Sequence, residues 1–318
     1  MSKPSIKDIA KIAGVTDITV SRAFTSPEKV KKDTREKILR IAQELNYTPN
    51  LSARSVRSSK SKIIGLIADD IFNPVYAFLI KELNAIAERE GYSVMIFNTN
   101  GCFSSEEAAI KTLISYNAAG AIVSPISDDL INQAHFERLI KSNIKIIQFD
   151  RQFSEQLPGV FIDSYYAGEL VGSRATGNTL IVGGPRNSMI TRQRINGILQ
   201  KLPEDAIPTV VYSDYHFEKC CKILKQFNKC NNIRFDCIIG ITGLISLAII
   251  SELNVNHDDE KLMSIDEIPL SNLYGLHCTH VHHDYKEWAR LVAVNLFNSI
   301  NKNGNAFRFF IKGTLNGK

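Results

Sequence analysis

IKDIAKIAGVTDITVSRAF, residues 6–24, is the stretch that decides the fold of the first part of this chain. Apolar side chains recur at helical spacing from residue 6 to residue 13, and Gly14 then supplies the left-handed conformation that ends a helix. Ser5 and Asp8 stand three residues apart at its start, which is the spacing of a capping box with Asp in place of Glu or Gln. We therefore expect a short first helix that stops at Gly14.

Two further helices follow directly. Thr16 is placed to cap a second helix that runs to about Phe24, and Asp33 to cap a third over Thr34–Leu45. The second helix is too polar for ordinary core, and its outward-facing side chains are Asp17, Ile18, Ser21 and Arg22. Three short helices with a glycine turn between the first two predict a helix-turn-helix, although a small helical subdomain with a solvated face is the alternative.

Charged residues are divided unevenly between the two parts of the chain. Residues 1–62 hold 14 Lys or Arg against 6 Asp or Glu, whereas the other 256 residues hold 24 against 27. The net charge of +5 therefore combines a head of +8 with a body of −3. A concentrated basic region is typical of a protein that binds phosphates, and double-stranded DNA is the simplest such partner.

Short segments that follow the first helices come in a fixed order. They are TREKI at 34–38, ELNYTPN at 44–50, ARSVR at 53–57, IIGLI at 63–67 and DIFNPVY at 70–76. Together with residues 6–22, these segments resemble the lactose-repressor/galactose-repressor (LacI/GalR) family of bacterial transcription regulators. The remainder of the chain is more loosely similar, in the same order.

The outward face of the second helix has the chemistry that reads base pairs in a major groove. Arg22 can donate bidentately to guanine, Asp17 can accept from cytosine, and Ile18 can contact a thymine methyl group. Asp17 has the alternative role of stabilising the helix N-terminus through the helix dipole. The resemblance implies that Asp17, Ile18 and Arg22 read bases, and that Thr16, Thr19 and Ser21 contact phosphates.

Residues 50–58 are similar to the hinge helix of that family. The resemblance implies that this segment orders on DNA and inserts an apolar side chain into the minor groove. Val56 takes the wedge position, where the family usually has Leu, and Asn50, Arg54 and Arg57 accompany it. A flexible basic linker is the alternative for this segment.

Composition limits the class of protein further. None of the six cysteines forms a C-x-x-C pair, so we expect free thiols rather than a disulfide framework. The first 20 residues do not read as a signal peptide, and the apolar charge-free stretch 237–251 has 15 residues, whereas a membrane span needs about 20. We expect a cytoplasmic protein that does not interact with a membrane.

After Lys62 the sequence alternates between apolar runs and amphipathic stretches. The runs are 63–68, 93–97, 120–124, 145–149, 159–162, 179–183, 208–212, 237–241 and 261–265. Stretches such as 76–89, 106–116 and 191–202 between them have helical patterns. This alternation predicts an α/β fold with parallel sheets covered by helices, and the length suits two sheets better than one.

The domain boundaries follow from these patterns and from the resemblance. We expect a helix-turn-helix domain at 1–49, a hinge helix and linker at 50–62, and an effector-binding and dimerisation domain at 63–318. The resemblance implies two lobes like those of a periplasmic sugar-binding protein, with a ligand between them. We place the first lobe at about 63–157 and 284–301, and the second at about 158–283 and 302–318.

The resemblance also nominates the residues that bind an effector. TRQRING at 191–197 places Arg194 at the ligand arginine of the family, and SIDEIPL at 264–270 places Asp266 at its ligand aspartate. Guanidinium and carboxylate groups suit paired hydroxyls. The other candidates are Phe72, Asn73, Tyr76, Asp150, Asp163 and His283. A helix cap or a surface charge is the alternative for each of them.

Two departures from the family pattern concern the effector. Ile241 and Thr242 stand where the family often has an Asn-Asp pair, and His283 replaces a glutamine. The cationic candidates Arg151, Arg194 and His283 tilt the expectation from a sugar toward a sugar acid. The histidines at 277, 280, 282 and 283 invite a metal site, but no cysteine or carboxylate arrangement completes one, so we expect neither metal nor cofactor.

These observations predict a sequence-specific DNA-binding regulator. We expect a repressor of carbohydrate-use genes that works as a homodimer on a near-palindromic operator and responds to a small sugar or sugar acid. A transport-type sugar-binding protein is the alternative, but it would not need a basic helical head. A nucleotide-dependent α/β enzyme is disfavoured because neither G-x-G-x-x-G nor G-x-x-x-x-G-K-[ST] occurs.

Overall fold

The computed structural model describes residues 4–47, 60–126, 134–230, 233–253, 255, 261–301 and 306–316. The chain divides into two units, residues 1–61 and residues 62–318. Among the described residues, no helix is long and apolar enough to cross a membrane. All six cysteine thiols are free, as predicted.

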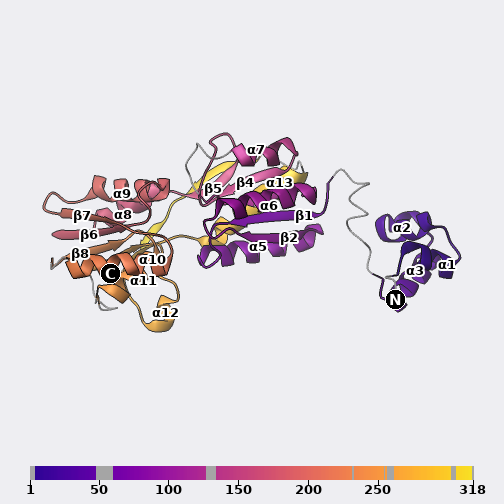
Figure 1. Cartoon of the computed structure of the whole chain (residues 1–318), viewed down its shortest axis with the longest axis horizontal. Coiled ribbons are helices and arrows are strands. Elements are labelled where there is room, and N and C mark those ends of the chain that lie inside the picture. Colours follow the sequence, from indigo (N-terminus) through magenta and orange to yellow (C-terminus); the bar gives the residue numbers. More distant parts are fainter. Residues whose placement is uncertain are drawn as a thin grey trace. The chain divides into compact units, whose positions relative to one another are not determined.

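The first unit is the predicted set of three helices, with a short 3-10 turn before the third (Figure 1). The elements are α1 (Ile6–Ala13), α2 (Asp17–Thr25), η1 (Pro27–Lys29) and α3 (Lys32–Glu44). Ser5 and Asp8 form the capping box, and Gly14 ends α1 at φ 70°. Thr16 caps α2 by accepting a hydrogen bond from the backbone N–H of Thr19.

The predicted cap of the third helix is wrong. Helix α3 begins at Lys32, its N-cap is Lys31, and no side chain caps it. Asp33 lies inside the first turn, where a negative charge still interacts favourably with the helix dipole. The helix starts earlier because η1 ends at Lys29 and Val30 is extended, which brings the chain into the helix one residue before Asp33.

The second unit contains two six-stranded sheets, as the alternation of runs and helices predicted. The first sheet has the order β11-β5-β4-β3-β1-β2, and all its described pairings are parallel. Its strands are β1 (Ile63–Ala68), β2 (Ser93–Asn98), β3 (Gly120–Val123), β4 (Lys145–Phe149), β5 (Gly159–Ile162) and β11 (Arg308–Ile311). Two apolar clusters pack on its two faces. Its helices are α5 (Val75–Glu90), α6 (Phe103–Ser115), α7 (Ala134–Lys141) and α13 (Tyr285–Asn301).

The second sheet repeats this topology in the order β12-β10-β9-β8-β6-β7, with only β12 antiparallel to its neighbour. Its strands are β6 (Asn178–Gly183), β7 (Ile207–Tyr212), β8 (Cys237–Gly240), β9 (Leu262–Ile265), β10 (Thr279–His282) and β12 (Thr314–Asn316). In Figure 1 the helices α8 and α9 lie on one face, and α10 and α11 on the other. These helices, with the short α12, are α8 (Ser164–Gly172), α9 (Met189–Lys201), α10 (Phe217–Cys230), α11 (Gly243–Glu252) and α12 (Ser271–Tyr274).

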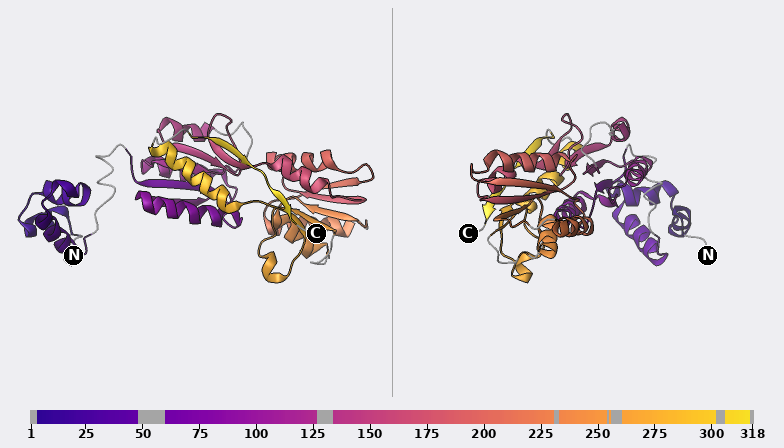
Figure 2. Two further views of the ribbon diagram at one scale, coloured as in Figure 1. Left: turned by 180° about the vertical axis from the view of Figure 1, so that it is seen from behind. Right: turned by 60° about the vertical axis from the view of Figure 1, so that its left-hand side comes forward.

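The boundary between the lobes differs from the expected one at two strands. We expected residues 158–283 and 302–318 in the second lobe, but β5 and β11 pair with each other in the first sheet. The chain therefore crosses between the lobes after β5, after β10 and after β11, and Figure 2 shows the last crossing as the yellow segment. An apolar run predicts that a strand is buried, but it does not indicate which sheet the strand joins.

Candidate functional site

The exposed face of α2 is the first candidate site. Asp17, Ile18 and Arg22 are exposed, with Ile18 at 57% of its full accessibility, whereas Thr19 and Ser21 are half-buried. The face therefore offers a guanidinium, a carboxylate and an apolar side chain together, as the sequence predicted.

The core behind α2 fixes this face. Val20 and Ala23 of α2 are buried against apolar side chains of α1 and α3. Lys37 of α3 donates a hydrogen bond of 3.0 Å to the carbonyl of Ala13, which satisfies a free acceptor at the end of α1. The shared apolar core and this hydrogen bond thus hold the three helices together, while Arg22 remains exposed.

The predicted hinge residues lie outside the described residues. Asn50, Arg54, Val56 and Arg57 all fall in 48–59. Their roles remain predictions.

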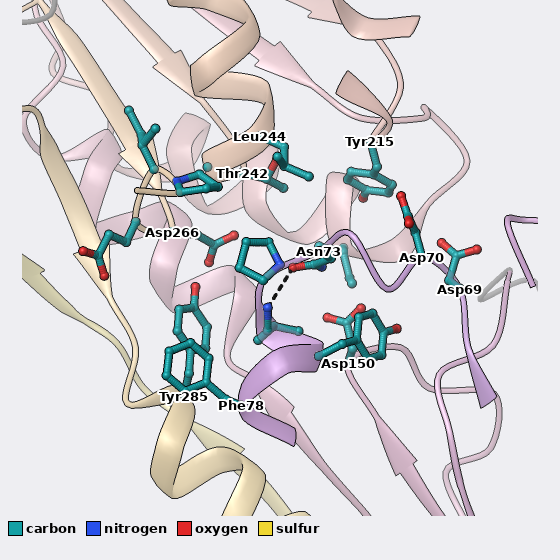
Figure 3. A pocket seen from close by; sticks show the side chains of 18 of the residues that line it. Asp69, Asp70, Asn73, Phe78, Asp150, Tyr215, Thr242, Leu244, Asp266 and Tyr285 are labelled. Carbon is teal, nitrogen blue, oxygen red and sulfur yellow. Dashed lines mark hydrogen bonds between the residues drawn. The ribbon is translucent and has the colours of Figure 1, made fainter. Parts of the chain in front are cut away.

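The second candidate site is a cleft of about 370 Å³ in the second unit. It receives residues from both lobes, at the carboxyl ends of parallel strands, where α/β folds bind ligands. Asp69 follows β1 and Asp150 follows β4 in the first lobe, whereas Asp266 follows β9 in the second. Figure 3 shows Asp69, Asp70 and Tyr215 at one end of the cleft and Asp266 with Tyr285 at the other.

Arg194 and Asp266 form a buried ion pair in the wall of the cleft. Nη1 and Nη2 of Arg194 donate to the two carboxylate oxygens of Asp266 at 2.6 and 3.2 Å, and Nη1 also donates to the carbonyl of Ile241 at 2.5 Å. Burial by itself would raise the pKa of Asp266, but the charge of Arg194 and the contact with His283 outweigh it and hold the pKa well below its usual range. The carboxylate therefore stays ionised.

His283 lies beneath this pair. Its side chain is fully buried, and its Nε2 lies 3.4 Å from Oδ1 of Asp266. The same ring packs against Gly313, because a Cβ built on that residue would come within 2.6 Å of His283 Cε1. His283 thus supports Asp266 from the crossings between the lobes and does not line the cleft.

A second ion pair joins Arg151 to Asp69. Nη1 of Arg151 lies 2.9 Å from Oδ2 of Asp69, and the guanidinium lies over the ring of Tyr215 at 5.4 Å from its centre. Asp69 and Arg151 belong to the first lobe, whereas Tyr215 belongs to the second. This cation–π contact therefore spans the cleft.

Asp150 differs from the other buried carboxylates because no ion pair neutralises it among the described residues. Burial raises its pKa, although the charges of Arg151 and Arg194 lower it in part. Its backbone is left-handed, at φ 62°, which turns the chain sharply at the end of β4. The result is a carboxylate that faces the cleft without an ion-pair partner among the residues that the structure describes; Figure 3 labels it in the cleft wall.

Asp70 and His216 approach each other from opposite lobes. Nε2 of His216 lies 3.9 Å from Oδ2 of Asp70, while Nδ1 of the same ring bonds Asp214 at 2.6 Å. The pKa of Asp214 is lowered, because hydrogen bonds from His216 outweigh the opposing effect of burial.

The eight predicted effector residues separate into two groups. Those that line the cleft are Asn73, Tyr76, Asp150, Arg194 and Asp266. Phe72 is 83% exposed and lies outside the lining, and Asp163 caps α8 by accepting from the N–H of Tyr166 at 3.0 Å. His283 is the third residue outside the lining, beneath Asp266.

Several lining residues were missed in the sequence. They are Asp69, Asp70, Tyr215, His216, Thr242, Glu267 and Tyr285. Asp69 and Asp70 follow the apolar run 63–68 directly, and Tyr215 and His216 follow 208–212. The rule that ligands bind beyond the carboxyl ends of strands could therefore have nominated four of them.

The histidine cluster does not assemble around one point. His280 contacts the carbonyl of Cys278 at 3.1 Å through Nδ1, whereas His283 is buried against Asp266. Within the described residues, no group of three or more His, Cys, Asp or Glu side chains is placed to hold a metal ion.

Known proteins share this organisation. The model of the family described as "Bacterial regulatory proteins, lacI family" matches residues 5–50. The ribose operon repressor of Lactococcus lactis subsp. lactis (strain IL1403) is 30% identical over 278 residues, which cover 84% of this chain and 82% of that protein. The sucrose operon repressor of Klebsiella pneumoniae is 27% identical over 301 residues, or 90% of this chain and 89% of that protein. The structure of the lac repressor dimer bound to operator and the anti-inducer ONPF has a TM-score of 0.77 at 19% identity, covers 99% of this chain and 98% of that chain, and so has the same fold.

Proposed function

The chain belongs to the LacI family of bacterial regulatory proteins, and on that premise we propose that it represses genes of sugar use under the control of a bound sugar. As a member of this family it is a DNA-binding transcriptional regulator and not an enzyme. The names of the two relatives, a ribose and a sucrose operon repressor, support a sugar as the effector.

The DNA partner is proposed to meet α2 in its major groove. Arg22 reads guanine through a bidentate contact, while Asp17 and Ile18 read the neighbouring base pairs. Thr16, Thr19 and Ser21 contact phosphates. The exposure of Asp17, Ile18 and Arg22 supports this assignment, because side chains that read DNA must be free to reach it.

The operator is proposed to be near-palindromic and the protein a homodimer. A single helix-turn-helix covers few base pairs, and a two-fold dimer reads a two-fold site. The hinge helix expected at 50–58 would add minor-groove contacts through Asn50, Arg54, Val56 and Arg57. This assignment rests on the sequence of the hinge.

The effector is proposed to bind in the cleft between the two lobes of residues 62–318. Arg194 offers a hydrogen-bond donor, and Asp266 and Asp150 offer acceptors. Oδ1 of Asn73 accepts from the backbone N–H of Val75 at 3.2 Å, so the side-chain NH2 group of Asn73 remains as a donor. Such alternating donors and acceptors suit adjacent hydroxyl groups.

One observation carries the proposal. A basic helical unit with an exposed reading face and a polar cleft between two α/β lobes occur in one chain. A transport-type sugar-binding protein would need the polar cleft but not the basic helical unit.

The test uses Arg194→Ala on the full chain. Operator DNA is first selected from random sequence with the wild-type protein, and binding is then measured with and without D-ribose or sucrose. We expect a ligand to change operator affinity by about 5- to 150-fold in the wild type, the usual range of such couplings. Arg194→Ala should bind the operator equally well without ligand and lose the response. An unchanged response in that variant would place the effector elsewhere.

A further inference from the structure

Carboxylates dominate the charges around the cleft. Those that line it belong to Asp69, Asp70, Asp150, Asp266 and Glu267. Of the described lining residues, Arg151 and Arg194 carry the permanent positive charges. The lining therefore has an excess of negative charge before any ligand enters.

Both guanidinium groups are already neutralised by carboxylates. Arg151 lies 2.9 Å from Asp69, and Arg194 binds Asp266 through two hydrogen bonds. All four of these side chains are largely buried. An anionic ligand that took either guanidinium as its counter-ion would compete with the carboxylate already paired to it, and separating a buried pair leaves that carboxylate without compensation.

The cleft still offers both hydrogen-bond donors and hydrogen-bond acceptors to a ligand. Arg194 uses three of its five N–H groups in the hydrogen bonds that it makes with described residues. Of the other two, Nε–H is buried, so one N–H of Nη2 remains for a ligand. Asp150 receives no hydrogen bond from any described residue, and its carboxylate needs donors. A hydroxyl group both donates and accepts, whereas an ammonium group has no acceptor and an ionised carboxylate has no donor.

From these contacts, and resting on the proposed function, we infer that the effector is an uncharged polyol and that the cleft rejects the corresponding sugar acids and sugar phosphates. This inference replaces the expectation that favoured a sugar acid. That expectation counted Arg151, Arg194 and His283 as available cations, but the two arginines are paired and His283 lies beneath the cleft.

The first experiment compares ligands that share a carbon skeleton. The full chain is titrated calorimetrically with D-ribose, D-ribonate and D-ribose 5-phosphate. The affinity for ribose should exceed the affinity for either anion by about a hundredfold or more, because each anion is repelled by the buried carboxylate of Asp150. Sucrose serves as a second uncharged ligand in the same titration. An anionic member that binds as tightly as the neutral one would overturn the inference.

A pair of variants tests the role of Asp150. Asp150→Asn removes one negative charge from the cleft, so the affinity for ribonate relative to ribose should rise about tenfold or more. Asp205→Asn makes the same change on an exposed residue outside the cleft and should leave this ratio unaltered. An unaltered ratio in Asp150→Asn would also overturn the inference.

A thermal measurement separates failure of the inference from failure of the proposed function. If inorganic phosphate or ribonate stabilises the wild type but not Arg194→Met, the cleft binds anions and the charge inference is wrong. If the neutral sugars stabilise the wild type and the anions do not, both the proposed function and the inference are supported. If neither the neutral sugars nor the anions stabilise it, the proposed sugar effector is wrong and the inference that rests on it falls as well.

Discussion

Asp150 and Asp266 occupy equivalent places in the two lobes, but their surroundings push their pKa values in opposite directions. Each follows the strand that stands fourth from the β2 or β7 edge of its sheet, and each has a left-handed backbone, at φ 62° and 80°. Burial raises the pKa of Asp150, while Arg194 holds the pKa of Asp266 low against the same effect of burial. The presence of an ion-pair partner therefore distinguishes the two carboxylates.

Asp150 should make effector binding depend on pH. Its pKa is raised above the usual value for Asp of about 3.9. Ligand hydroxyls donate to the ionised form, so the affinity should be complete above the raised pKa and should fall as the pH drops through it. Calorimetric titrations with the bound sugar between about pH 7.5 and pH 4 would measure this decline.

Two variants identify the group that is responsible. Asp150→Asn should bind more weakly at pH 7.5 and should lose the decline, because its amide does not titrate in this range. His216→Gln removes the imidazole of the cleft and should retain the decline. If the decline survives in Asp150→Asn, another group controls the binding.

Arg22 should supply operator preference rather than general DNA affinity. Arg22→Ala removes a bidentate contact, so it should cost about 1–3 kcal/mol on the operator and little on random DNA. Arg40→Ala removes the same charge from an exposed position on α3 and should preserve the preference. Binding to both DNAs at two salt concentrations checks this prediction. Equal losses on operator and random DNA would mean that Arg22 contacts only phosphate.

At the scale of elements, the contact between α8 and α9 positions Arg194, the arginine proposed to bind the effector. A Cβ on Gly168 would lie 2.2 Å from the carbonyl oxygen of Arg194, and one on Gly197 would lie 2.1 Å from that of Tyr165. Two helix backbones therefore touch at these glycines. Arg194 lies on this stretch of α9, so the spacing of the helices sets the position of its guanidinium.

Gly197→Ala should separate the two helices. The new methyl group meets a backbone oxygen that cannot rotate away, so we expect a loss of about 1–3 kcal/mol in the free energy of unfolding and a weaker affinity for the effector. Asn196→Ala lies next to it on the exposed side of α9 and should change neither quantity appreciably. Urea unfolding and calorimetric titration measure the two effects. Full stability in Gly197→Ala would show that the helices can move apart without cost.

At the scale of the whole second unit, three crossings join the lobes. They lie near Asp163, His283 and Gly313, and the N–H of Asp163 donates to the carbonyl of Ile311 at 2.9 Å. A ligand between the lobes can alter DNA affinity only if it favours one lobe arrangement over another. His283 contacts both Asp266 and Gly313, so the crossings are directly connected to the aspartate that is proposed to bind the effector.

The oligomeric state supplies a prediction for the complete molecule. We expect a homodimer at micromolar concentration, because a two-fold operator is read by two copies of α2. Sedimentation velocity of the free protein and of its complex with a palindromic operator would measure the stoichiometry. A stable monomer that binds the palindrome tightly would contradict this prediction.

Local patterns in the sequence determined most of the architecture. The capping box at Ser5 and the left-handed Gly14 fixed α1. The polar face of α2 correctly identified Asp17, Ile18 and Arg22 as exposed, whereas Ser21, also expected to face outward, is half-buried. The alternation of apolar runs and amphipathic stretches predicted the two parallel sheets. These signals are readable because capping, turn formation and side-chain periodicity depend on residues within a few positions of each other.

The tertiary structure alone decided sheet membership and the electrostatics of the cleft. β5 and β11 lie 149 positions apart at their first residues and still pair, and Arg194 meets Asp266 across 72 positions. A sequence lists these charges but does not show which of them neutralise each other. Pairing and burial, which depend on the folded arrangement, determine that Asp266 is paired with Arg194, whereas Asp150 has no ion-pair partner among the described residues.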